Sequence, residues 1–261
     1  MDNLALIQSE TDRFIAVLRD VDPQAPVPTC PEWTAADLLW HLTVVHAFWS
    51  HILATGALTD DESEQVEANN PARLDDPEAV IALLEAETTA LVNELAARED
   101  AQPAWSWFAA NQTVGFTRRM QVHEATMHRV DAEAAAGVAS APISPEVAAD
   151  GIAHAIEVMF AWWGTLPGFS FERATGAVAL RPSDAEPRLV VGGRWRGTGE
   201  SGKSYDEPGL KFTADAEPVA TISGTADELY RWLWGRGPEP AMDGDPVALE
   251  AVRATQARGV Q

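Results

Sequence analysis

The sequence predicts an α+β protein of two domains, an antiparallel helix bundle followed by a small domain of strands and helices. Helical patterns fill the first part of the chain, up to about residue 165, with no strand-like run between them. Short apolar or β-branched runs bounded by Gly, Pro and Asp follow, and two further helical patterns close the chain. A length of 261 residues suits two domains. We expect them to span 1–165 and 166–261.

The predicted bundle has clear helix start and stop signals. We expect helices over residues 3–20, 33–54, 77–98 and 113–136, and a further one that starts after Ser144. Thr34 and Asp37 approximate a capping box, and Ser144 followed by Pro145 is typical of a first helical turn. Long helices joined without strands favour an antiparallel bundle. Residues 59–78 are acidic and polar, which predicts a solvated loop between the second and third helices.

The second predicted domain begins with strands and ends with helices. The strand-like runs are "GAVALRP", "RLVVGG", "KFTA" and "PVATIS". Thr225 and Glu228 form a capping box in "TADELYRWLWGR", and Asp245 caps "DPVALEAVRAT" with Pro246 next. Strands followed by helices are typical of an α+β domain.

The charge of the chain argues against two kinds of partner. The formal net charge is -22, from 40 acidic and 18 basic residues. Because Lys and Arg supply most of the affinity for phosphate groups, we expect neither nucleic acid nor an anionic membrane as a partner. The sequence gives no indication of an oligomeric state.

The location of the protein is predicted from two segments. The N-terminus lacks the basic patch, apolar stretch and cleavage site of a secretory signal, so we expect a cytoplasmic protein. Residues 38–59 carry no charged residue and are long enough to span a membrane. Their histidines, His41, His46 and His51, would be costly in lipid, so we predict a buried bundle helix instead.

Cys30 is the single cysteine in the chain. One cysteine excludes an intrachain disulfide and a cluster of thiolate metal ligands. A free cysteine is usually packed as a small apolar residue, which is the role we expect for Cys30. Thiol chemistry would need Cys30 itself or an external thiol.

Three side chains predict a metal site inside the bundle. Glu124 and His128 are four residues apart in "HEATMH" and lie on one helix face, although alone the pair is equally compatible with a surface ion pair. His41 is expected to point into the core, where it needs polar partners. For His41 alone, a hydrogen bond to a hydroxyl or carbonyl is the alternative. One carboxylate and two imidazoles on facing helices suit a divalent transition metal, and three protein ligands leave positions open for water or substrate.

Residues near this set are further candidates for the same site. His123, His46 and His51 lie on other helix faces and are weaker candidates for ligands. Asp131 and Arg129 follow His128 closely and are candidates to orient an imidazole. An exposed ion pair is the alternative for both.

The chain resembles the mycothiol-dependent maleylpyruvate isomerase family. The resemblance rests on "VPTCPEWTAADLLWHL", "HEATMHRVDAE" and "GTADELYRWLWGR" followed by "GDPVAL", and it extends over nearly the whole chain. It implies a DinB-like four-helix bundle and a C-terminal α+β domain. The metal triad of the family corresponds to His41, Glu124 and His128, its usual metal is zinc, and its thiol cofactor is mycothiol. Residues 59–78 do not match the characterised isomerase, so the resemblance does not extend to the substrate pocket.

The resemblance also implies a catalytic role and a reaction class. Arg236 in "LWGR" matches a motif arginine and is a candidate to hold an anionic substrate or the thiol, with a structural ion pair as the alternative. The expected activity is that of a metal-dependent enzyme that uses mycothiol, either a cis–trans isomerase of the maleylpyruvate type or an S-transferase. Its substrate would be a small electrophilic or anionic molecule. Metal coordination would convert the thiol, which is mostly protonated at neutral pH, into a thiolate.

Two other functions fit the same residues. A non-catalytic protein of this fold would bind a metal or a small molecule without turnover. A metal-dependent hydrolase would use metal-bound water as the nucleophile in the open coordination position.

Overall fold

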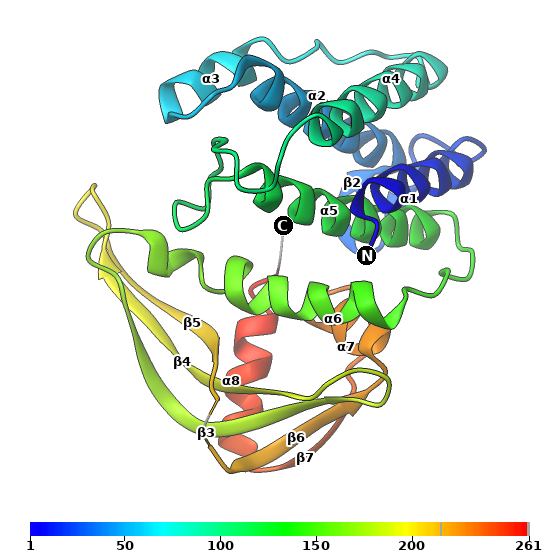
Figure 1. Ribbon diagram of the computed structural model, residues 1–261. Coiled ribbons are helices and arrows are strands. Elements are labelled where there is room, and N and C mark those ends of the chain that lie inside the picture. Colours follow the sequence, from blue (N-terminus) through cyan, green and yellow to red (C-terminus); the bar gives the residue numbers. More distant parts are fainter. Residues whose placement is uncertain (215, 260–261) are drawn as a thin grey trace. The chain divides into compact units, whose positions relative to one another are not determined.

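The computed structural model describes residues 1–214 and 216–259 and confirms the predicted α+β class (Figure 1). The chain forms two compact units, Met1–Ala141 and Pro142–Gln261. This division differs from the predicted boundary at 165/166, because helix α6 (Pro145–His154) belongs to the second unit and packs on α7 (Ala226–Leu233). The contact is close: a Cβ atom added to Gly151 of α6 would lie 2.2 Å from the Tyr230 ring.

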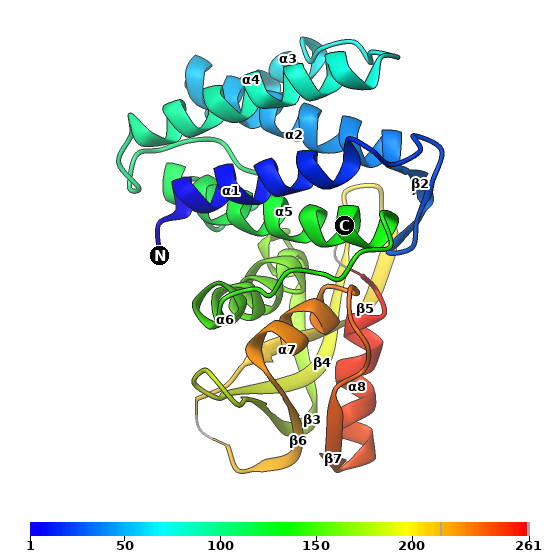
Figure 2. The same cartoon turned by 90° about the vertical axis from the view of Figure 1, so that its right-hand side faces the viewer.

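The first unit is a bundle of four long helices (Figure 2). The helices are α1 (Asn3–Leu18), α2 (Ala35–Thr55), α4 (Pro77–Ala96) and α5 (Val114–Ala135). Helices α1 and α2 each pack on both α4 and α5. Fully buried apolar side chains such as Phe14, Leu38 and Leu84 form the core between them. The predicted helix bundle is therefore confirmed, including its long apolar second helix.

Two arginine contacts fix the direction of α5 relative to its neighbours. The Arg98 guanidinium, just after α4, donates a 2.7 Å hydrogen bond to the carbonyl of Leu53 near the end of α2. The Arg118 guanidinium, near the start of α5, donates a 2.6 Å hydrogen bond to the Leu95 carbonyl near the end of α4. The first turns of α5 thus lie beside the last turns of α2 and α4, so α5 runs antiparallel to both.

The start of α2 carries the predicted cap and a hairpin that the sequence did not predict. The Thr34 hydroxyl accepts a 3.2 Å hydrogen bond from the Asp37 amide, and the Asp37 carboxylate accepts a 3.0 Å hydrogen bond from the Thr34 amide. Immediately before this capping box, β1 (Pro26–Val27) pairs antiparallel with β2 (Cys30–Thr34). The hairpin holds Cys30 and Trp33 against the bundle.

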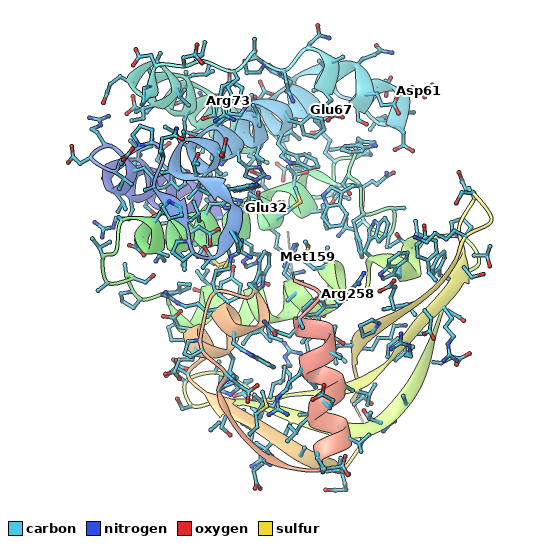
Figure 3. The ribbon with its side chains drawn as sticks, turned by 180° about the vertical axis from the view of Figure 1, so that it is seen from behind. Glu32, Asp61, Glu67, Arg73, Met159 and Arg258 are labelled. Atoms are coloured by element: carbon cyan, nitrogen blue, oxygen red, sulfur yellow. The ribbon has the colours of Figure 1, made fainter. Side chains whose placement is uncertain are left out.

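The acidic stretch between α2 and α4 contains a helix, α3 (Asp60–Ala68), so the prediction of a loop over 59–78 is wrong there. Thr59 and Glu62 form a reciprocal capping box. Three acidic residues occupy the first turn, where their negative charges interact favourably with the helix dipole and stabilise the helix. One face of α3 is buried through Ser63 and Val66. Asp61 and Glu67 lie on its outside (Figure 3).

The second unit contains a five-stranded sheet with the strand order β5-β4-β3-β6-β7. The strands are β3 (Ser170–Pro182), β4 (Arg188–Thr198), β5 (Ser204–Phe212), β6 (Pro218–Gly224) and β7 (Ala241–Gly244). Among the strands that the structure describes in this sheet, only the β3–β6 pair is parallel. Helix α8 (Pro246–Gln256) packs along β3 to β6 (Figure 2). The predicted strand regions in β3, β4 and β6 are confirmed, whereas "KFTA" overlaps β5 only at Lys211 and Phe212, and β7 was missed.

Within the described part of the chain, none of the helices combines the length and the apolar character that crossing a membrane requires.

Candidate metal centre

Three predicted ligands meet between α2 and α5. Glu124 Oε1 lies 3.2 Å from His41 Nε2 and 3.1 Å from His128 Nε2, and one ligand atom from each residue lies within 4.8 Å of the others. Two donor atoms held about 2.1 Å from zinc at tetrahedral angles are about 3.4 Å apart. The spacing of these three side chains therefore fits a single metal ion with three protein ligands.

The local structure explains why these residues converge. Glu124 and His128 are one turn apart on α5, and both point toward α2, which supplies His41. The His128 side chain is 8% exposed, whereas those of His41 and Glu124 are 31% and 26% exposed. His41 thus lies at the edge of the bundle, which corrects the prediction that it points into the core. The site is thus partly exposed at His41 and Glu124 and closed at His128.

A buried carboxylate orients His128, as expected for Asp131. Asp131 Oδ2 lies 3.0 Å from His128 Nδ1, and the Asp131 side chain is fully buried. This hydrogen bond keeps a proton on Nδ1 and directs Nε2 toward Glu124, the usual arrangement of a carboxylate behind a metal-binding histidine. Cys30 is buried, as predicted, and its Sγ lies 3.8 Å from the same oxygen of Asp131.

The charges at the site stabilise one another in the metal-free protein. Burial favours a lower pKa for His128, but hydrogen bonds to Asp131 and Glu124 raise this pKa to about 9. Burial favours a higher pKa for Glu124, but hydrogen bonds to His128 and His41 hold it well below its usual range. The metal-free site thus holds an ionised carboxylate, the form that a divalent cation requires, and a protonated His128, which would release its Nε2 proton on metal binding.

Trp33 forms one wall of the site, a role that the sequence did not indicate. Its ring centroid lies 4.6 Å from that of His41 and 6.1 Å from that of His128. Trp33 comes just before the capping residue of α2, so it belongs to no helical face whose periodicity could be read from the sequence. Its contact with both imidazoles depends on the unpredicted hairpin.

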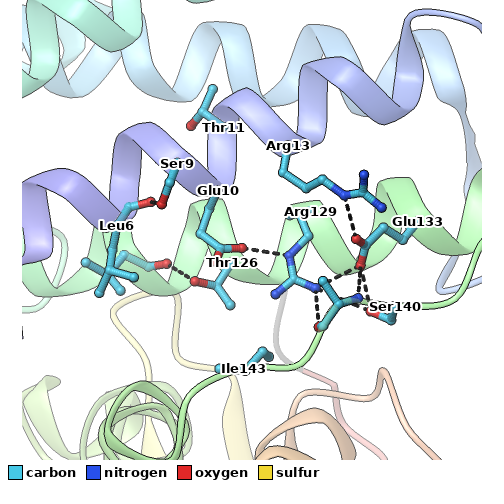
Figure 4. Close-up of polar contacts among 12 residues, drawn as sticks. Leu6, Ser9, Glu10, Thr11, Arg13, Thr126, Arg129, Glu133, Ser140 and Ile143 are labelled. Atoms are coloured by element: carbon cyan, nitrogen blue, oxygen red, sulfur yellow. Dashed lines mark hydrogen bonds and ion pairs between the residues drawn. The ribbon is translucent and has the colours of Figure 1, made fainter.

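Arg129 does not orient an imidazole and is not part of an exposed ion pair, so both predictions for it are wrong. It is 1% exposed, and its guanidinium donates to Glu10 Oε2 at 2.6 Å, Glu133 Oε2 at 2.8 Å and the Ala141 carbonyl at 2.8 Å (Figure 4). Burial favours a higher pKa for Glu133, but the Arg129 hydrogen bond lowers it below the usual value. Arg129 instead ties α1 and α5 to the segment after α5.

The remaining candidates lie outside the ligand set. His46 is fully buried and its Nδ1 lies 2.9 Å from the Thr88 hydroxyl. His123 is also buried, and among the described residues neither it nor His51 joins a group of convergent metal ligands. Arg236 is half-buried in the second unit and donates a 2.7 Å hydrogen bond to the Trp234 carbonyl. Its catalytic role stays a prediction.

Comparisons with known proteins agree with both units. A family model described as the mycothiol maleylpyruvate isomerase N-terminal domain matches residues 4–133, and the model of the C-terminal domain of that family matches residues 146–251. A comparison with curated protein sequences gave no significant match.

Two solved structures share the fold. One is a mycothiol-dependent maleylpyruvate isomerase, with a TM-score of 0.57, 17% sequence identity, and coverage of 94% of this chain and 93% of the other. The second is a mutant of that enzyme with one histidine replaced by alanine, with a TM-score of 0.56, 16% identity and the same coverage. At such low identity these similarities establish the fold alone. Because the two family models together match most of its length, the chain belongs to the mycothiol-dependent maleylpyruvate isomerase family.

Proposed function

We propose that the protein is a metal- and mycothiol-dependent enzyme that either isomerises a cis double bond or transfers the thiol to an electrophile. The observation that carries the proposal is the convergence of His41, Glu124 and His128 on one point at the edge of the bundle. Family membership supports mycothiol as the thiol. The substrate would be a small electrophilic or anionic molecule.

His41, Glu124 and His128 would hold the metal, for which zinc suits two imidazoles and a carboxylate. A metal bound there would lower the pKa of a coordinating thiol so that it reacts as a thiolate. Asp131 keeps the Nε2 atom of His128 directed at the site, and Trp33 covers one side of both imidazoles. These two residues define where a thiol can approach.

The thiol itself would come from outside the chain. Cys30 is buried, and its Sγ faces the Asp131 carboxylate behind His128 rather than the exposed side of the site. In the isomerase reaction the thiolate would add to the conjugated double bond of a cis-diacid, rotation about the resulting single bond would follow, and elimination would return the thiol with the trans product. In the transferase reaction the thiol adduct would be the product. Arg236 is proposed to bind the anionic group of the substrate or the thiol.

The test is a thiol- and metal-dependence assay on the purified protein. The protein would be given mycothiol together with either a maleylpyruvate-type cis-diacid or a simple electrophile. Each reaction would be measured with the untreated protein, with the protein after a chelator has removed its metal, and with that protein after zinc has been added back. We expect turnover that needs both the thiol and the metal and that is lost in His41→Ala but kept in His51→Ala. An isomerase would leave the thiol concentration unchanged, whereas a transferase would consume it.

Turnover without added thiol would instead indicate a hydrolase. A protein that binds zinc and turns over neither compound would contradict an enzymatic role toward these substrates and favour the non-catalytic binder.

A further inference from the structure

The two histidines of the metal centre are held in different ways. His128 has a buried carboxylate behind it, because Asp131 accepts a hydrogen bond from its Nδ1 at 3.0 Å. Among the described residues, the His41 ring has one hydrogen-bonding contact, at 3.2 Å from its Nε2 to Glu124. A metal ion held by Nε2 would replace that contact. Hydrogen bonds within the protein would then leave the orientation of the His41 ring undetermined.

Aromatic packing restrains the His41 ring instead. Its centroid lies 4.6 Å from that of Trp33, with 42° between the ring planes. The His128 ring lies 4.7 Å from it and nearly edge-on, at 73°. Both spacings lie within the range of favourable aromatic pairs, about 4.5–7 Å. The two neighbouring rings therefore limit the rotation of His41, although its side chain is 31% exposed.

The local structure keeps Trp33 in this place. Trp33 lies in β2, directly before the capping residue Thr34, a position from which a side chain can pack back on the first turns of a helix. The reciprocal hydrogen bonds between Thr34 and Asp37 fix the direction in which the chain enters α2. The Trp33 side chain also packs against the apolar core of the bundle. The hairpin, the cap and the core thus all support the indole.

We propose that Trp33 is a positioning residue of the metal centre, which holds the His41 imidazole in its metal-binding orientation as Asp131 does for His128. The inference rests on the metal centre proposed above, and it adds the β1–β2 hairpin to the two helices that carry the ligands. Trp33 acts through His41 rather than on the substrate. The alternative is a purely structural role, in which Trp33 only packs on the start of α2.

The first test measures the zinc dissociation constant of full-length variants by competition with a chelator. Trp33→Leu keeps an apolar side chain beside the cap but removes the aromatic face, and Trp33→Phe restores an aromatic ring. Trp40→Leu is the matched control, because Trp40 precedes His41 on α2 and packs against the same core. We expect about 3- to 10-fold weaker binding for Trp33→Leu, the factor that one aromatic pair contributes, and near-native binding for the other two variants.

The second test is NMR of the histidine rings in the metal-free protein, which does not depend on zinc binding. In the native protein we expect one fixed orientation of the His41 ring, with cross-relaxation between this ring and the Trp33 indole. In Trp33→Leu the His41 ring should become mobile. The His128 ring should stay fixed in the same variant, because Asp131 still holds it.

The two tests separate this inference from the proposed function. The inference would be overturned by a His41 ring that stays as ordered in Trp33→Leu as in the native protein. It would also be overturned if Trp33→Leu weakened zinc binding no more than Trp40→Leu does. A native protein that binds no zinc would contradict the proposed function, and the NMR comparison would still decide whether Trp33 positions His41.

Discussion

The orientation of His128 depends on one buried carboxylate. Asp131 accepts from Nδ1 at 3.0 Å, and without this contact the ring could rotate or change tautomer. We therefore predict that Asp131→Asn weakens zinc affinity by about 10- to 100-fold, the usual effect of losing such an outer partner. Competition with a chromophoric chelator would measure the dissociation constant.

Cys30→Ala is the matched control for that experiment. It removes one further neighbour of the same carboxylate oxygen, 3.8 Å away, and leaves the contact with His128 in place. We expect near-native affinity for Cys30→Ala. Equal affinities for Asp131→Asn and the native protein would show that His128 is oriented by its packing alone.

His46 gives the metal-free protein a defined dependence of stability on pH. Its pKa is lowered from 6.5 to about 4 by burial, with Glu124 opposing the shift, His128 and His41 adding to it, and the neutral Thr88 as its hydrogen-bond partner. The pKa of His46 is lower in the folded than in the unfolded protein, so neutral His46 contributes its full share of the unfolding free energy above pH 6.5. This contribution is lost as the pH falls toward 4, and the loss amounts to about 3 kcal/mol.

The measurement compares urea unfolding of the native protein and His46→Gln at pH 7 and pH 4.5, with a chelator present. Other titrating groups are common to both proteins, so their effects largely cancel. We expect the native protein to lose stability relative to His46→Gln as the pH falls. A difference in unfolding free energy that stays constant, or that grows in favour of the native protein, would contradict a buried neutral His46.

The sequence predicted the convergence of three side chains better than their surroundings. Glu124 and His128 were paired from helical spacing, because a period of 3.6 places side chains four apart on one face, and His41 was added from its residue type on the facing helix. Trp33 was missed because a short hairpin places it, and the partial exposure of His41 was missed because packing sets the edge of a helix bundle. Arg129 was misread because two of its partners, Glu10 and Ala141, lie on α1 and after α5, and only Glu133 is one turn away.

At the scale of elements, a buried ion network holds the last turns of α5. Arg129 is almost completely buried and Glu133 is fully buried, and an Arg129 guanidinium nitrogen lies 2.8 Å from Glu133 Oε2. Glu10 of α1 forms a second ion pair with Arg129. We predict that Arg129→Met costs about 3–5 kcal/mol of unfolding free energy, because it leaves the Glu133 charge buried with too few partners. Chemical denaturation would measure the loss.

Arg13→Met provides the control on the same carboxylate. Arg13 contacts Glu133 Oε1 at 3.1 Å, but its side chain is 48% exposed, so this exposed contact contributes about 1 kcal/mol or less. We also expect Arg129→Met combined with Glu133→Met to recover part of the lost stability. If Arg129→Met cost no more than Arg13→Met, the network would not be what fixes this end of α5.

Helix caps account for most of the elements that were predicted well. Thr34, Ser144, Thr225 and Asp245 all cap helices as expected, since each side chain satisfies an amide at a helix start. The same chemistry at Thr59 and Glu62 could have revealed α3, but the acidic composition of that stretch favoured a loop. Strand β7 was missed because its four residues carry no apolar alternation.

At the scale of the whole molecule, two family domains follow each other along the chain. The fold class was predictable because helical and strand-like patterns are segregated in the sequence. The boundary was not, because α6 continues the helical pattern of the first unit while packing with the second. All three candidate metal ligands and Asp131 lie in the first unit, so the proposed metal chemistry depends on that unit for its ligands.

The most direct test of the central claim is the zinc content of the purified protein after equilibrium dialysis, measured by elemental analysis. We predict one zinc ion per chain, with a large loss in each of His41→Ala, Glu124→Ala and His128→Ala and none in His51→Ala. Circular dichroism would confirm that the variants remain folded. A native protein without stoichiometric metal, or a zinc content that none of the three ligand variants changes, would contradict the account.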